Sequence, residues 1–355
     1  MASILATFLS IAKIALASAT IFSPFQLSNP TISFVSNDAS HGWATGINLF
    51  NITVGIGQDD PQLSFILEKN HDLISPDAHI QYIGSSKNAQ NIHFPDYILT
   101  KGAVWIQERK GKPWKEAGWA RLAVIQTAEN LLFDGTFTLK SGQYEIQIQS
   151  NGNGRTGMVA HQVEQAFSMN DQILDRTICA TRPAFSFENR QEQAYNPTNL
   201  IGNTSGCPKI RMTAYIGLVT DCSYTSSFNS TDAVHRYLLN VVNTASIVFE
   251  NSFNISLTVQ NLTISDTECP SDGPGSSAWN APCSTGDLNS RLEDFSQWRS
   301  TLYDNNAYWT LFSGCAAPSG EVGVSWVGAL CTEGSGSGSG ANVVGRAQTE
   351  WQVFA

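Results

Sequence analysis

Short runs of alternating apolar and polar residues dominate the first part of the chain. An alternation with a period of two is typical of strands that bury one face, and turn-forming residues separate the runs. The pattern predicts an all-β module over residues 30–150, built as a sandwich or a barrel. The predicted strands are 31–36, 62–68, 79–84, 103–108, 119–127, 135–140 and 144–150.

The pattern changes after residue 207, where helical and extended periods alternate. A helix is expected at 231–251, capped by Ser230 or Thr231, and a second one at 287–303. Strands are expected at 211–219, 255–264, 308–312 and 322–329, and a flexible Gly/Ser loop at 334–340. This order of elements indicates an α/β domain over residues 207–355.

A polar stretch rich in Asn, Gln and Gly separates the two patterned regions. It covers residues 151–206 and predicts a connector between domains. The whole chain is therefore expected to be multidomain, with an N-terminal all-β module followed by an α/β domain.

The N-terminus has the features of a secretory signal. Residues 1–19 contain an apolar run that ends in Ala17-Ser18-Ala19, a small-x-small cleavage pattern, although Lys13 interrupts it. The alternative is a buried N-terminal helix. No later stretch approaches the roughly 20 apolar residues that a transmembrane helix needs, so we expect no membrane span.

Cysteine and sequon usage agrees with a secreted protein. The chain has seven cysteines, and Cys269 and Cys283 bracket a turn-rich segment that a local disulfide would close. The odd count leaves at least one thiol unpaired or paired with another chain. Five Asn-x-Ser/Thr sequons predict a glycosylated surface, at Asn51, Asn203, Asn229, Asn254 and Asn261. A net charge of −10 argues against nucleic acid or an anionic membrane as a partner.

Five segments carry a resemblance to a known family: 209–234, 253–270, 305–315, 322–331 and 339–355. Together they resemble the front half of a reprolysin-type zinc metalloprotease domain, in the fungal branch of the ADAM (a disintegrin and metalloprotease) family. Segments 70–75 and 116–123 are similar to the β-rich prodomain of such proteases. The resemblance implies a prodomain-like module followed by an incomplete α/β metzincin-like domain.

In that family the sequence at 349–355 is followed by an HExxH zinc motif, so we expect this chain to be a fragment truncated just before it. None of its six histidines are spaced i, i+4. Zinc is the cofactor of the complete family member, but we expect none in this chain, and no activity from the chain alone. The short final helix beginning near Glu350 is expected to be exposed or poorly packed, with Trp326, Trp351, Val353 and Phe354 as candidates for an uncovered apolar patch.

The resemblance also assigns possible roles to single residues. The strand with Gly323, Val324, Ser325 and Trp326 resembles the edge strand that these proteases lay beside the substrate; the alternative is an ordinary sheet strand. Cys179 is a candidate latency cysteine; the alternatives are that it forms a disulfide or is a buried free thiol. Cys331 is expected to be unpaired or bonded to Cys315. His235 is expected to be solvated.

The resemblance implies a secreted or cell-surface zinc metalloendopeptidase that acts on peptide or protein substrates. The alternative, from a different class, is a truncated non-catalytic protein that binds or inhibits a full-length relative. Either reading places the protein in the secretory pathway or outside the cell.

Overall fold

The computed structural model describes residues 24–34, 49–56, 61–83, 90–91, 97–126, 131–140, 142–150, 156–163, 178–183, 208–270, 278–315, 321–327, 329–331, 339–346, 350 and 354. The expected signal at 1–19, the sequon at Asn203 and the thiol of Cys207 lie outside these residues. The chain divides into two compact units. The first takes residues up to Asn70 and from Asp96 to Gln165; the second takes His71–Pro95 and Ala166–Ala355.

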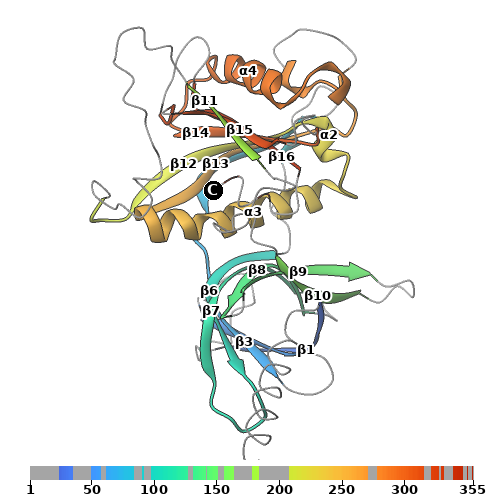
Figure 1. Ribbon diagram of the computed structural model, residues 1–355, viewed down its shortest axis with the longest axis vertical. Helices are drawn as coiled ribbons and strands as arrows, with labels where there is room; N and C mark the ends of the chain where they lie inside the picture. The colour runs from blue at the N-terminus through green and yellow to red at the C-terminus, as the bar shows by residue number, and fades with distance from the viewer. Residues whose placement is uncertain are drawn as a thin grey trace, which may run out of the picture. The chain divides into compact units, whose positions relative to one another are not determined.

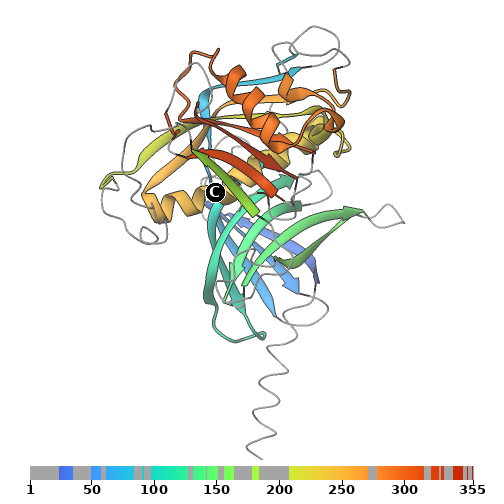
Figure 2. The ribbon, with the colours of Figure 1, turned by 45° about the horizontal axis from the view of Figure 1, so that its top comes forward.

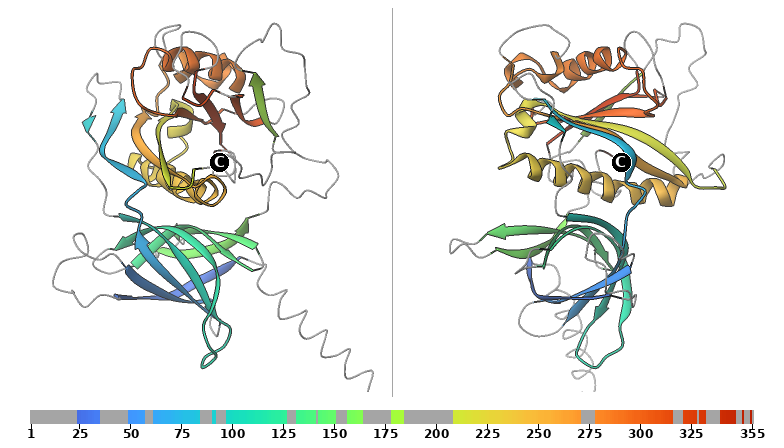
Figure 3. Two further views of the ribbon diagram at one scale, coloured as in Figure 1. Left: turned by 90° about the vertical axis from the view of Figure 1, so that its left-hand side faces the viewer. Right: turned by 180° about the vertical axis from the view of Figure 1, so that it is seen from behind.

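The first unit is a closed antiparallel β-barrel, which Figures 1 and 3 show in different orientations. Its strand order is β1-β10-β9-β8-β7-β6-β3-β2, and closure leaves no open edge. The strands are β1 (Phe25–Phe34), β2 (Leu49–Ile56), β3 (Gln62–Lys69), β6 (Tyr97–Gln107), β7 (Lys115–Gln126), β8 (Leu131–Leu139), β9 (Gly142–Ser150) and β10 (Thr156–Val163).

Aromatic side chains fill the interior of the barrel. The ring of Phe65 lies 5.7 Å from that of Phe133 and 5.4 Å from that of Phe137, both edge-on. Phe137 in turn stacks on Tyr144 at 5.3 Å. The alternation predicted from the sequence therefore does create an inward apolar face, and the expected β-rich N-terminal part is confirmed.

Strand boundaries around the barrel differ from the sequence-based expectation. β2 and β10 were not predicted, and β10 lies within the stretch taken as a connector. The predicted strand 79–84 exists as part of β4 (Ile74–Ile83), but it belongs to the second sheet. Alternation reveals a strand, yet it does not reveal which sheet the strand joins.

The second unit is built on a mixed sheet of order β11-β15-β16-β14-β12-β13-β4-β5. Its central strands β13, β12, β14 and β16 are parallel, and β15 is antiparallel to β16. The strands are β5 (Gln90–Asn91), β11 (Ile178–Pro183), β12 (Met212–Thr220), β13 (Ile255–Ser265), β14 (Tyr308–Ser313), β15 (Glu321–Val327) and β16 (Ala341–Gly345).

Two long helices cover opposite faces of this sheet (Figure 1). Helix α3 (Thr231–Phe253) contacts β13, and helix α4 (Leu288–Arg299) contacts β14, β15 and β16. Ser230 caps α3 by accepting a hydrogen bond from the Ala233 N–H at 3.2 Å, as one of the two predicted caps. Asp287 caps α4 in the same way through the Ser290 N–H, at 2.9 Å. Neither helix, nor any other in the described part of the chain, combines the length and apolarity needed to cross a bilayer.

Both edges of the sheet are formed by segments that precede residue 207. β4, light blue in Figure 3, lies parallel to β13, and the two-residue strand β5 pairs with β4 at that edge. β11, yellow-green in Figure 2, lies parallel to β15 at the other. The stretch expected to be a connector thus contributes one strand to each unit, β10 to the barrel and β11 to the sheet.

The residues near the C-terminus are buried where exposure was expected. Glu350 is 1% exposed and Phe354 is 4% exposed. The ring of Phe354 stacks on Phe312 at 6.0 Å and also meets Tyr308 at 6.1 Å. Trp351 and Val353 are outside the described residues. The expectation of an exposed final helix is therefore wrong for Glu350 and Phe354.

Candidate functional site

The predicted substrate strand is β15, and its side chains divide between two environments. Gly323 and Val324 are buried, whereas Ser325 and Trp326 are half-buried. The indole N–H of Trp326 donates to the Ser296 hydroxyl on α4, at 2.6 Å. Trp326 is therefore anchored to helix α4 and does not form part of an uncovered patch.

The backbone of β15 is paired on both sides. β16 lies antiparallel on one side, with Gly323 opposite Val344. β11 lies parallel on the other, with Cys179 opposite Gly323 and Arg182 opposite Trp326. Within the described residues, the outer edge that would hold a substrate is therefore occupied by β11. The backbone of Cys179 reaches the predicted substrate strand, but its side chain is outside the described set.

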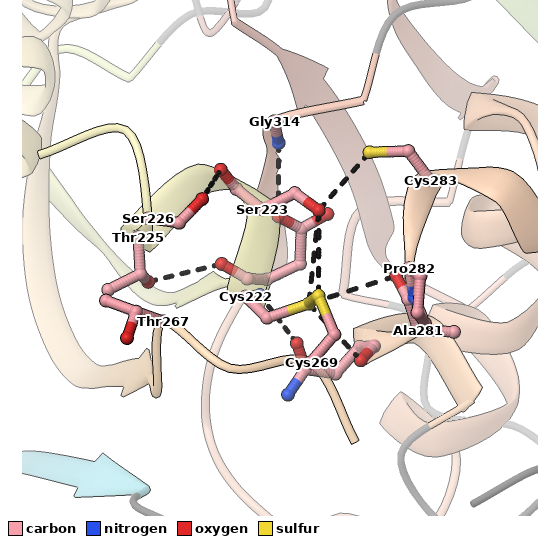
Figure 4. Close-up of a disulfide and its surroundings, with 12 residues drawn as sticks. Cys222, Ser223, Thr225, Ser226, Thr267, Cys269, Ala281, Pro282, Cys283 and Gly314 are labelled. Carbon is pink, nitrogen blue, oxygen red and sulfur yellow. Dashed lines mark hydrogen bonds between the residues drawn. A yellow bond between two sulfur atoms is a disulfide. The ribbon is translucent and has the colours of Figure 1, made fainter. Parts of the chain in front are cut away.

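Two disulfides lie together beyond the carboxyl ends of the central strands, with the Ser223 hydroxyl 3.8 Å from the Cys269 sulfur and 3.2 Å from the Cys283 sulfur. Figure 4 shows one of them, with Cys283 beside it. The two disulfides join Cys222 to Cys269 and Cys283 to Cys315. The predicted bridge between Cys269 and Cys283 is wrong, although both residues do form disulfides. Proximity in sequence misled here, because the topology brings α2 (Cys222–Thr225) and the end of β14 to the same place. Cys331 is a free, exposed thiol and is not bonded to Cys315.

Asp221, at the end of β12, organises the loops around these disulfides. Its buried carboxylate accepts hydrogen bonds from the Tyr224 N–H at 2.7 Å, the Ser313 hydroxyl at 2.5 Å and the Gly314 N–H at 3.1 Å. Burial raises the pKa of Asp221, while Ser313, Arg291 and the backbone donors act in the opposite direction. Asp221 caps α2, but its link to β14 had no signal in the sequence.

Arg291 completes this centre from helix α4. Its guanidinium lies 3.3 Å from the Asp221 carboxylate and is almost fully buried. It also donates to the backbone carbonyls of Trp279 at 2.7 Å and Ala281 at 2.6 Å. Because both oxygens of the Asp221 carboxylate are engaged, the pair acts as a structural clamp and leaves Asp221 no free oxygen for acid–base chemistry. Arg291 was not predicted, because in the sequence it has the pattern of an ordinary charged helix residue.

Gly314 has to be a glycine in this arrangement. A Cβ at this position would lie 2.4 Å from the Ser223 carbonyl carbon, well inside van der Waals contact. The small residue lets the β14 end approach α2 closely enough for the Gly314 N–H to reach Asp221.

A second polar contact ties the C-terminal residues to α2. The Tyr224 hydroxyl donates to the buried Glu350 carboxylate at 2.5 Å. The guanidinium of Arg346 lies over the Phe228 ring at 4.3 Å and also near the rings of Tyr224 and Tyr237. The Tyr224 hydroxyl thus gives the buried Glu350 carboxylate a hydrogen-bond donor.

His235 lies on α3 and is fully buried, so the expectation of a solvated histidine is wrong. Burial lowers its pKa to about 4, and nearby Asp232 counteracts part of the effect. The helix buries all residues from 241 to 247, so it is covered on more than one side. An amphipathic stripe read from the sequence underestimates burial in such a helix.

The sequons differ in how accessible their asparagines are. Asn229 is exposed in the turn before α3. Asn51 accepts from the Ser64 hydroxyl at 2.5 Å, and Asn261 accepts from the Asn306 amide at 2.8 Å, both within strands. The Asn254 amide donates to the Pro208 carbonyl at 3.0 Å. Among the described sequons, Asn229 is thus exposed, whereas the side chains of Asn51, Asn254 and Asn261 form hydrogen bonds.

The residues present do not fit a catalytic zinc ion. Among the described residues, no three His, Cys, Asp or Glu side chains come together as a ligand group. Across the whole sequence, none of the six histidines are spaced i, i+4 on a helix. The chain as it stands therefore lacks the paired histidine ligands that a catalytic zinc of this type requires.

Comparison with known proteins places this chain in a family. Residues 210–355 match the model of metallo-peptidase family M12, of the reprolysin type. Over 403 aligned positions the chain is 30% identical to the disintegrin and metalloproteinase domain-containing protein B of Aspergillus fumigatus, covering 93% of this chain and 50% of that protein. It is 29% identical over 380 positions to the protein of the same name from Arthroderma otae, covering 86% of this chain and 47% of that protein.

The chain therefore spans about half the length of the relatives it matches. The M12 match begins just before β12, and it includes β12–β16, α3 and α4 but neither β4 nor β11. The strands on the outer sides of β13 and β15 thus come from the sequence that precedes the matched domain. By its family match and its relatives over most of its length, the chain belongs to the reprolysin/ADAM type of metalloproteinase.

Proposed function

We propose that this chain is part of a secreted zinc metalloendopeptidase precursor, in which β15 is the strand that binds an extended peptide substrate. The family match supports the reaction class. The observation that carries the assignment of β15 is its pairing with β11 from Cys179–Gly323 to Pro183–Val327. An edge that accepts one extended segment through its backbone can accept another.

Binding at this edge would depend on main-chain groups more than on side chains. Gly323 and Val324 are buried, so the substrate would meet their peptide groups, while the half-buried Ser325 and Trp326 would contact its side chains. Trp326 is held by Ser296, which fixes the strand against α4. The contribution of this chain to catalysis would be the orientation of the peptide.

β11 would then keep the precursor latent, because it occupies the same edge as the substrate. Cys179 lies opposite Gly323 in this pairing and is the candidate latency cysteine. The other reading of Cys179 is a disulfide partner or a buried thiol. Peptide hydrolysis itself is assigned to a longer form of the protein that supplies zinc ligands, since the residues of this chain do not fit the metal.

The test uses the longest protein encoded by the gene, purified from a secretory host. We expect stoichiometric zinc and hydrolysis of a quenched-fluorescence peptide, with a higher rate in Ala180→Pro, which removes one backbone donor from β11. Lys110→Pro, in an exposed barrel turn, is the matched control and should leave the rate unchanged. A product with neither bound zinc nor hydrolytic activity would contradict the proposal.

The second candidate is a non-catalytic protein that binds or inhibits a full-length relative. The misfit between the residues present and zinc favours it for the chain alone. Adding the purified chain to an active ADAM-type relative distinguishes the two. The precursor proposal predicts no change in the relative's rate at micromolar chain, and saturable inhibition would support the second candidate.

A further inference from the structure

Residues 70–96 interrupt a barrel that does not need them for closure. β3 and β6 pair with each other from Gln62–Gln107 to Lys69–Thr100, so their neighbouring ends could be joined by a short hairpin. The chain instead leaves the barrel unit at His71 and returns at Asp96. In between it forms β4 and β5, the last two strands of the other sheet.

β4 is bound to β13 along most of its length. The two strands run parallel, and their pairs extend from Val259–Ile74 to Ser265–Ile83. Further bonds surround the ladder: the Val259 N–H donates to the Leu73 carbonyl at 2.8 Å. The Thr258 hydroxyl donates to the Asp72 carbonyl at 2.6 Å, and the Gln81 amide donates to the Thr263 hydroxyl at 3.0 Å.

Apolar burial accompanies these hydrogen bonds. Leu73 is 1% exposed and Ile80 is 8% exposed, whereas the adjacent His79 faces solvent. On the partner strand, Leu257, Val259, Leu262 and Ile264 are all buried. If β4 were removed, β13 would become the edge of the sheet and would present a row of unpaired backbone groups.

We infer that the outer edge of β13 is a strand-docking surface whose occupant is Ile74–Ile83, and that this pairing keeps the barrel attached to the second unit after the chain is cut between β10 and β11. The chain crosses between the units at 70/71, 95/96 and 165/166. A cut at the third crossing leaves the barrel covalently joined to β4, and β4 remains in the second sheet. The inference does not depend on the proposed peptidase activity.

No disulfide can substitute for this attachment within the chain. The first cysteine in the sequence is Cys179, so a fragment that ends between Val163 and Ile178 contains none. β11 begins at Ile178 and stays with the C-terminal fragment after such a cut. Among the strands that the structure describes, the pair β4–β13 then links the two fragments.

The test is made on the full chain with a site-specific protease sequence inserted between Val163 and Ile178. After cleavage, the two fragments should elute together in size-exclusion chromatography at micromolar concentration. Ile80→Asp places a charge on the buried face of β4 and should weaken the association at least ~10-fold. His79→Asp adds the same charge one residue away, on the exposed face, and should leave the fragments together.

Separation of the cleaved wild-type fragments would overturn the inference, and so would co-elution of the Ile80→Asp fragments with unchanged affinity. If the Ile80→Asp chain does not fold, hydrogen exchange on the cleaved wild-type chain decides the matter. The amides of β13 should remain protected after the cut, and an excess of a synthetic peptide of residues 71–83 should release the barrel fragment. Unprotected β13 amides, or a peptide that releases nothing, would contradict the assignment.

Discussion

At the scale of residues, the buried Asp221–Arg291 pair connects separate elements of the second unit. It joins the end of β12 to helix α4 and positions the loops that carry both disulfides. Buried pairs of this kind contribute little against an apolar replacement, but the loss of one partner leaves an uncompensated charge. The loss of Asp221 is therefore expected to lower the stability of the second unit, because Arg291 is buried beside it.

Asp221→Asn should destabilise the second unit by about 3–5 kcal/mol, because it removes the buried counter-charge that lies 3.3 Å from the Arg291 guanidinium. Urea unfolding followed by tryptophan fluorescence measures the change. Asp232→Asn, at the exposed first turn of α3, is the control and should cost less than about 1 kcal/mol. Equal effects of the two substitutions would show that the Asp221 contact is not a structural clamp.

The accessible sequon predicts where glycan is attached. In a eukaryotic secretory host, Asn229→Gln should reduce the glycan mass by one chain, because Asn229 is exposed. Asn261→Gln should leave the glycan mass unchanged, because Asn261 lies inside β13 and is bonded to Asn306. Intact-mass spectrometry before and after enzymatic deglycosylation measures both. A glycan on Asn261, or none on Asn229, would contradict this assignment.

His235 predicts an acid-sensitive stability. Its pKa falls from 6.5 to about 4 on folding, so the unfolded chain binds more protons between these pH values. The stabilisation is complete above pH 6.5 and is lost as the pH falls towards 4, by at most about 3 kcal/mol. His235→Leu should flatten this part of the stability profile, because it removes the buried group that titrates there. An unchanged slope in His235→Leu would refute the role of this group.

At the scale of elements, the sequence predicts what is local and misses what is not. Helix α3 was predicted within two residues at its C-terminus, because its cap and apolar spacing are encoded in consecutive positions. β4 was recognised as a strand but assigned to the wrong sheet. Partner choice depends on surfaces that are distant in sequence, and Thr258 reaches Asp72 across 186 residues.

The disulfides illustrate the same limit. Cys269 and Cys283 flank one loop, so sequence distance favoured joining them. The sheet places Cys222 at the end of β12 and Cys315 at the end of β14, and each takes one of the loop cysteines. The clamp residues Asp221 and Arg291 were likewise beyond prediction, because they lie on separate elements and only the fold brings them together.

Disulfide mapping tests this correction directly. Non-reducing peptide mass spectrometry should find Cys222 linked to Cys269 and Cys283 linked to Cys315. Replacing both Cys283 and Cys315 with Ser should reduce the free energy of unfolding by about 2–4 kcal/mol. Cys331→Ser removes the free, exposed thiol and should have almost no effect. A peptide containing Cys269 linked to Cys283 would contradict the structure.

At the scale of the whole molecule, the sequence of the barrel is interrupted by a segment, His71–Pro95, that belongs to the second unit. The matched family domain supplies the centre of the second sheet, and the preceding sequence supplies both of its edges. Exposed edge strands promote association between chains, so covering them protects the sheet. The edge at β13 is covered by the interrupted barrel sequence, and the edge at β15 by the segment that follows the barrel.

The central claim is that β11 and β4 cover the edges of the family sheet in the intact chain. Hydrogen–deuterium exchange with mass spectrometry measures this directly on the amides of β13 and β15. We predict slow exchange in both strands, and faster exchange in β15 alone when Ala180→Pro disturbs β11. Residues 108–112, in an exposed turn of the barrel, provide the reference for fast exchange. The claim would be contradicted if β13 or β15 of the intact chain exchanged as fast as this turn.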